Sequence, residues 1–309
     1  MTGPTFLGIG AQKAGTTWLH RALEDRTDVW VPPVKELHVF DEKLRHPEGW
    51  YSYLRGDRKV DKRWRRQLKN ERIRRAERES NDEDETLRRR WASRYFFEEP
   101  SIEWYHSLFD DIAGPCGEIT PDYAVLDGTD LARVREACPD VRAIYLLRNP
   151  IEREWSATMM ATRNAGRTPD MVLRGRHPHV RYTDIIERWS AIVGPGALYV
   201  GYFDDLHHRP TELLTDILQF IGAGTKNVEL PTGRPNSGGV STMPGDLAVG
   251  LAEQLGTEID ALAERIGGHA IRWQMIAEDL RRRRPEQQLE YPLSSPHRAD
   301  GYGLSSVVI

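Results

Sequence analysis

The sequence is poor in cysteine and has no long apolar run. Only Cys116 and Cys138 occur among its 309 residues, which argues against a disulfide scaffold or a cysteine-built metal site. No segment approaches the roughly 18 consecutive apolar residues of a membrane-spanning helix. The N-terminus also lacks the basic start and apolar core of a secretory signal. We therefore expect a soluble, cytoplasmic protein that does not insert into membranes.

The chain also lacks internal repeats, recognisable domain linkers and an excess of positive charge. Its net charge is −4, its pI is about 6.2 and 39% of its residues are hydrophobic, so it can bury a core but is a poor electrostatic match for nucleic acid. We expect one domain over residues 1–285 and a flexible tail over 286–309. Residues 57–94 read as charged helix, either a solvated face or a lid on the acceptor side.

Short apolar runs alternate with amphipathic segments along most of the chain. This alternation predicts an α/β fold with a P-loop-like, open parallel β-sheet and helices on both of its faces. The expected strands are 5–10, 141–147 and 197–202. The expected helices begin at Thr16 and cover 129–137, 151–161, 182–192, 210–221, 244–267 and 271–284, with a loop over 231–244.

The stretch GIGAQKAGTTWL (Gly8–Leu19) resembles a phosphate-binding loop but lacks the Walker lysine. A Walker loop places lysine directly after its second glycine, where this chain has Thr16. Lysine occurs instead at Lys13, inside the loop. A strand, a glycine-rich turn and a helix start present backbone N–H groups to an anion, so the stretch still predicts an anion site, although an ordinary turn between strand and helix is the alternative.

Three further motifs follow in order: PPVKELHVFD (Pro32–Asp41), GEITPDY (Gly117–Tyr123) and LLRNPIEREWSA (Leu146–Ala157). Together with GAQKAGTT, they resemble the bacterial sulfotransferases, which are related to the domains that sulfate heparan sulfate. The resemblance covers most of residues 5–275. It implies transfer of a sulfuryl group from 3′-phosphoadenosine-5′-phosphosulfate (PAPS) to a hydroxyl or amine, with 3′-phosphoadenosine 5′-phosphate (PAP) as the product and no metal required.

The resemblance also implies roles for individual residues. Lys13 would contact the leaving oxygen, while Arg148 and Ser156 would hold the 3′-phosphate. The glycine-rich stretch after Arg234 would form a late donor loop. The implied donor-binding residues are Gln12, Lys13, Ala14, Gly15, Thr16, Thr17, Trp18, Arg148, Ser156, Ser237, Gly238 and Gly239.

Glu36 matches the proposed catalytic base of the family, because an attacking hydroxyl must lose its proton to a group within reach. Lys35 or His38 could tune that carboxylate, and His38 could replace it as the base. A surface carboxylate and a packed loop histidine are the ordinary alternatives for Glu36 and His38. Both are therefore catalytic candidates, together with Lys13.

One position departs from the heparan-type pattern: Ile119 stands where those relatives carry a lysine. A polyanionic acceptor is therefore doubtful, and the expected partner is a small-molecule, lipid or sugar acceptor. The alternative function is a P-loop kinase or NTPase, which would need a working Walker lysine and a magnesium-binding aspartate.

Overall fold

The computed structural model describes most of the chain in several ranges. These are residues 3–41, 87–88, 90–91, 93–95, 98, 100–110, 112–165, 178–226, 228–231, 242–282, 290–292 and 306–309. Most of the charged segment 57–94 and the residues Ser237, Gly238 and Gly239 lie outside the described residues.

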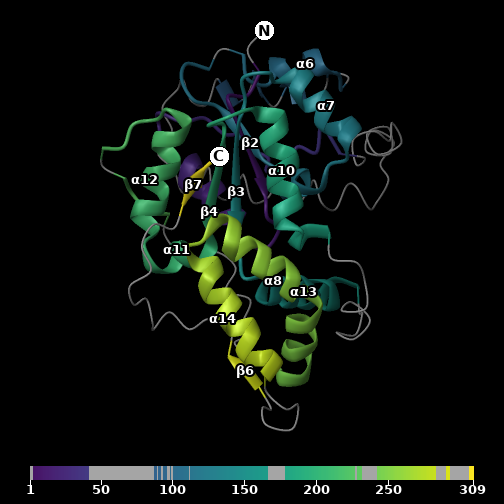
Figure 1. Ribbon diagram of the computed structural model, residues 1–309. Coiled ribbons are helices and arrows are strands. Elements are labelled where there is room, and N and C mark those ends of the chain that lie inside the picture. The colour runs from purple at the N-terminus through teal and green to yellow at the C-terminus, as the bar shows by residue number, and fades with distance from the viewer. Residues whose placement is uncertain are drawn as a thin grey trace.

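A five-stranded sheet in the order β2-β1-β3-β4-β7 forms the centre of the molecule (Figure 1). The first four of these strands in space pair in parallel, and β7 pairs antiparallel with β4. The strands are β1 (Phe6–Gly10), β2 (Gly117–Ile119), β3 (Arg142–Leu147), β4 (Leu198–Tyr202) and β7 (Val307–Val308). A second, two-stranded sheet joins β5 (Thr242–Pro244) to β6 (Glu290–Pro292).

Helices cover both faces of the sheet. In Figure 1, α10 runs alongside the strands; it packs on β3 and β4, and α1 packs on β2. The long helices α13 and α14 pack against each other at the lower end of the view. The helices are α1 (Thr16–Glu24), α6 (Ile102–Ser107), η1 (Pro121–Val125), α7 (Gly128–Ala137), α8 (Pro150–Ala165), η2 (Pro178–Val180), α10 (Tyr182–Val193), α11 (Phe203–His208), α12 (Pro210–Ile221), α13 (Gly245–Ile266) and α14 (His269–Arg282).

The three expected strands and the main expected helices are confirmed. Every residue of β1 and β4 is buried, as expected of parallel strands that carry helices on both faces. The cap of α7 differs from the prediction, which placed it at Thr129 or Asp130. Asp127 is the cap, and its side chain accepts a hydrogen bond from the backbone N–H of Asp130 at 2.9 Å.

The C-terminal tail does not behave as one flexible segment. Val307 and Val308 extend the sheet at β4, and the backbone N–H of Ile309 donates to the carbonyl of Leu198 at 2.9 Å. The predicted loop 231–244 likewise ends in the strand β5, paired with β6. Strands of two or three residues are too short to show the alternation that identifies a strand in sequence.

The parallel strands direct the loops that follow them to one edge of the sheet. The loops after β1, β3 and β4 therefore meet there, as expected for an open α/β sheet, in which ligands bind at the carboxyl ends of the strands. Within the described residues, no helix is both long and apolar enough to cross a membrane.

Gly117 is a position at which the sheet has no room for a side chain. A Cβ there would come within 2.1 Å of the carbonyl oxygen of Phe6, whereas a Cβ on Gly250 in α13 would meet no atom within 4 Å. We predict that Gly117→Ala lowers the free energy of unfolding by about 2 kcal/mol. Gly250→Ala, the matched control, should raise it by about 0.5 kcal/mol because alanine favours helix. Urea unfolding measures the free energy of unfolding of both variants. Equal stability of the two variants would contradict the predicted clash at Gly117.

Candidate functional site

The loop between β1 and α1 exposes the positive end of a helix. Lys13 (φ 73°) and Gly15 (φ 90°) adopt left-handed backbone conformations, which bring the chain abruptly from the strand into the helix. Gly15 caps α1 without any side-chain hydrogen bond. The first N–H groups of α1 therefore remain available to an anion. The backbone N–H of Ala11 donates to the carbonyl of Leu146 at 2.7 Å, which fastens the loop to β3.

The loop's predicted donor-binding residues differ in exposure. Lys13 is half-buried, and its Nζ lies 3.9 Å from Sδ of Met160 in α8. Ala14 and Trp18 are buried in the core. These two can therefore offer backbone groups to a ligand more readily than side chains. Thr16 is also buried, and Thr17 is half-buried.

Arg148 joins the end of β3 to this loop. Its Nη1 donates to the carbonyl oxygen of Lys13 at 3.1 Å, and its guanidinium carbon lies 4.5 Å from the centre of the Phe203 ring. Glu152 lies 3.6 Å from its Nη2. The Nε of Arg148 is buried with no hydrogen-bond partner among the described residues. Ser156 lies half-buried on α8, the helix that follows Arg148.

Arg153 supports the loop from α8, a role that the sequence did not reveal. Its Nε donates to the carbonyl oxygen of Gln12 at 3.0 Å, and its Nη2 donates to Oε1 of the same residue at 3.0 Å. Arg153 also pairs with Glu154 and is only 3% exposed. In the sequence, Gln12 and Arg153 are long polar side chains in two of the motifs. The motifs give no information on the distance between the two side chains.

Lys35 connects the loop to the segment that carries Glu36. Its Nζ lies 3.3 Å from the hydroxyl oxygens of both Thr16 and Thr17, and it donates to Oε1 of Glu36 at 3.1 Å. Burial lowers the pKa of Lys35, and the charge of Glu36 partly opposes that shift. The sequence predicted that Lys35 could tune Glu36, but not that it would reach the two threonines.

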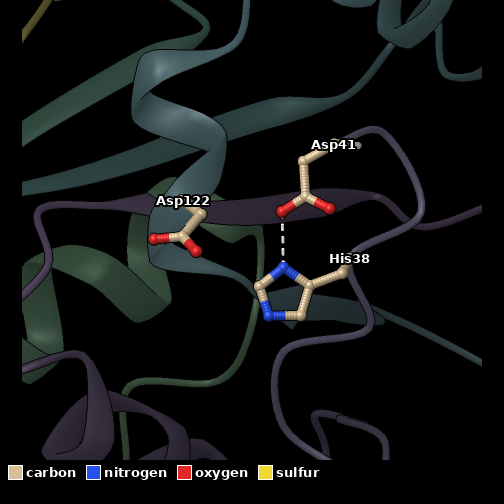
Figure 2. Close-up of side chains that lie close together, drawn as sticks. All are labelled: His38, Asp41 and Asp122. Carbon is tan, nitrogen blue, oxygen red and sulfur yellow. Dashed lines mark hydrogen bonds and ion pairs between the residues drawn. The ribbon is translucent and has the colours of Figure 1, made fainter. Parts of the chain in front are cut away.

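His38 lies among carboxylate side chains, of which Figure 2 shows Asp41 and Asp122. Its Nδ1 is hydrogen-bonded to Oδ2 of Asp41 at 2.5 Å, and its Nε2 lies 3.9 Å from Oε2 of Glu36. A carboxylate on Nδ1 fixes the orientation of the ring. The structure thus brings Glu36 and His38 together and adds Asp41, which the sequence did not single out.

Asp122 completes a group that was not expected from the sequence, where no metal-ligand constellation was recognised. Within the described residues, His38, Asp41 and Asp122 can each offer one ligand atom, and these atoms all lie within 4.8 Å of one another (Figure 2). Asp122 comes from η1, far from the other two in sequence. The hydrogen bond between His38 and Asp41 already gives these two side chains a role that needs no metal.

Ile119 is part of the apolar core. It is fully buried, and its Cγ1 would lie 2.7 Å from a Cβ placed on Gly8 of β1. The residue that stands at the position of the relatives' lysine is therefore part of the core between β2 and β1.

Comparison with known proteins supports the resemblance seen in the motifs. A sulfotransferase from Alicyclobacillus acidocaldarius has a similar fold, with a TM-score of 0.61 and 22% identity over 89% of this chain and 100% of that chain. The sulfotransferase domain of the Synechococcus olefin synthase matches with a TM-score of 0.49 and 18% identity, over 81% of this chain and 87% of that chain. A search of curated proteins found no match. The family model described as "Sulfotransferase family" matches residues 4–226, most of the chain, and the protein therefore belongs to the sulfotransferase family.

Proposed function

We propose that the protein transfers the sulfuryl group of PAPS to a hydroxyl or amine of a small-molecule, lipid or sugar acceptor. The observation that carries this proposal is the loop of residues 12–17. Its lysine lies within the turn, and a second lysine, Lys35, reaches the two threonines that open α1. Family membership supports the same reaction class.

The residues present fit a donor with two separated anions. The uncapped start of α1, Lys13 and Lys35 form one positive region, suited to the 5′-phosphosulfate. Arg148 supplies the second positive charge and Ser156 a hydroxyl donor, which together would hold the 3′-phosphate. The buried Nε of Arg148, which has no partner among the described residues, is a donor available to such an anion. Ser237, Gly238 and Gly239 remain proposed donor contacts outside the described residues.

Positioning and charge would supply most of the catalysis. PAPS, when bound, supplies an activated sulfuryl group: its bond to the 5′-phosphate oxygen breaks as a new bond forms from sulfur to the acceptor atom. Lys13 would neutralise the negative charge that gathers on the leaving oxygen. Lys35 would add a second positive charge from the opposite side of the loop. The acceptor's proton would pass to a base on the segment that carries Glu36 and His38.

Two residues compete for the role of base. Glu36 is about one-third exposed and is paired with Lys35 at 3.1 Å. His38 is almost buried, and Asp41 occupies its Nδ1, which leaves Nε2 directed towards Glu36. The acceptor proton could therefore pass to either group.

Ligand preference should separate this function from that of a kinase or NTPase. We predict that PAP at 100 times its Kd stabilises the folded protein by about 2.7 kcal/mol, whereas ATP with Mg²⁺ stabilises it far less. Differential scanning calorimetry with each ligand measures the difference. Stabilisation by ATP with Mg²⁺ alone would show that the protein is not a PAPS-dependent enzyme.

Lys13 should be essential for transfer. We predict that Lys13→Ala slows sulfuryl transfer by at least 100-fold, because the leaving oxygen loses its positive partner. Lys226→Ala, which removes an exposed lysine beyond α12, serves as the control and should leave the rate unchanged. The assay follows ³⁵S from labelled PAPS into a metabolite extract by mass and radioactivity. Equal rates in the two variants would remove Lys13 from the proposed site.

Replacement of each candidate base should show which one takes the proton. We predict that Glu36→Gln slows transfer about 100-fold and leaves the Kd of PAP, measured by calorimetric titration, within twofold of the unmodified protein. His38→Gln is the paired variant. A normal rate in Glu36→Gln with a slow rate in His38→Gln would assign the base to His38.

A further inference from the structure

A buried carboxylate lies beneath the segment that carries Glu36 and His38. Glu118 in β2 is 1% exposed, and burial raises its pKa although its hydrogen bonds favour the ionised form. It gathers three side-chain donors and one backbone donor. These are the hydroxyls of Tyr105 and Tyr123, each at 2.9 Å, the hydroxyl of Thr120 at 2.7 Å and the backbone N–H of Leu37 at 3.2 Å.

The segment itself alternates between anchored and site-facing residues. Glu36 (φ 65°) and His38 (φ 58°) have left-handed backbones, which are unfavourable for residues with side chains and need support from their surroundings. The backbone N–H groups of the residues that follow each of them, Leu37 and Val39, supply that support. Leu37 donates to Glu118, and Val39 donates to the hydroxyl of Tyr123 at 2.8 Å.

We propose that Tyr123 is a positioning residue that fixes His38 for proton transfer. Its hydroxyl donates to Glu118 and accepts from the N–H of Val39, so it links a rigid strand to the residue that follows His38. With that link in place, the His38 ring is positioned to form its hydrogen bond with Asp41. The consequence for catalysis rests on the proposed function, but the effect on His38 itself does not.

Tyr105 provides a matched control within the same network. Both tyrosines are fully buried, donate to the same oxygen of Glu118 at the same distance, and contact the Phe40 ring edge-on, at 5.3 Å for Tyr105 and 5.6 Å for Tyr123. Tyr123 differs from Tyr105 in that its hydroxyl also accepts a hydrogen bond from the backbone N–H of Val39. Replacement of each tyrosine by phenylalanine removes one hydrogen bond to Glu118, but only Tyr123→Phe also removes the bond to the Val39 N–H. The comparison thus separates the effect of that anchor from a general loss of packing or of a Glu118 contact.

The test is nuclear magnetic resonance of the ¹⁵N-labelled histidine rings, with His38 identified by its loss in His38→Gln. We expect Tyr123→Phe to shift the His38 ring signals and to weaken the signature of the Nδ1 proton shared with Asp41. Tyr105→Phe should leave those signals in place. Melting temperatures verify that both variants fold. Unchanged His38 signals in a folded Tyr123→Phe, or equal changes in both variants, would overturn the proposal.

A measurement on the unmodified protein covers the case in which Tyr123→Phe does not fold. We expect the amide of Val39 to exchange its hydrogen at least 100-fold more slowly than an unstructured chain, because its N–H is bonded to a buried hydroxyl. Exchange of that amide at the unstructured rate would show that the anchor does not hold and would overturn the proposal.

The catalytic consequence can be judged separately from the donor. Where both variants fold, Tyr123→Phe should slow ³⁵S transfer at least tenfold, with the Kd of PAP within twofold, while Tyr105→Phe should stay within twofold on both measures. Absence of PAP binding in the unmodified protein would contradict the proposed function but leave the His38 result intact. An equal rate in the two variants would count against the positioning role.

Discussion

The ammonium of Lys35 joins the two parts of the site. It contacts the hydroxyls that open α1 and the carboxylate of Glu36 at the same time, so the anion-binding loop and the segment that carries the candidate bases are set at a fixed separation. A partly buried ammonium is costly unless its donors are used, and here three oxygens use them. Any shift of either segment would leave that charge poorly paired. Lys35 therefore contributes to the alignment of the proposed donor and acceptor sides.

The arrangement around this pair follows from the sheet. β1 and β3 run in parallel, and their loops carry Lys13 and Arg148 to the same edge. The hydrogen bond from Arg148 to the carbonyl of Lys13 then ties the two proposed anion sites together. Because α8 follows directly, Arg153 reaches back to Gln12. A single strand pair thus positions most of the proposed donor side.

Much of the fold could be predicted because its strong signals are local. Strand β3 and helix α10 are long and periodic, and the loop before Thr16 is recognisable by its glycines and its lysine. Lys13, Glu36 and Arg148 could be proposed as site residues only because a motif contains each of them. Asp41, Asp122, Arg153 and Tyr123 escaped because their roles depend on which distant backbone they meet, and pattern along the chain does not carry that information. The two-residue strand β7 escaped for lack of length.

The contact between Ile119 and Gly8 bears on how acceptor preference could change over evolution. In this chain the two residues are complementary: the absence of a side chain on β1 makes the space that the isoleucine on β2 fills. Replacement of Ile119 by the lysine of heparan-type relatives would place that side chain in the core. Its ammonium would then lie against apolar neighbours. Recovery of that lysine's role would therefore need compensating changes in β1.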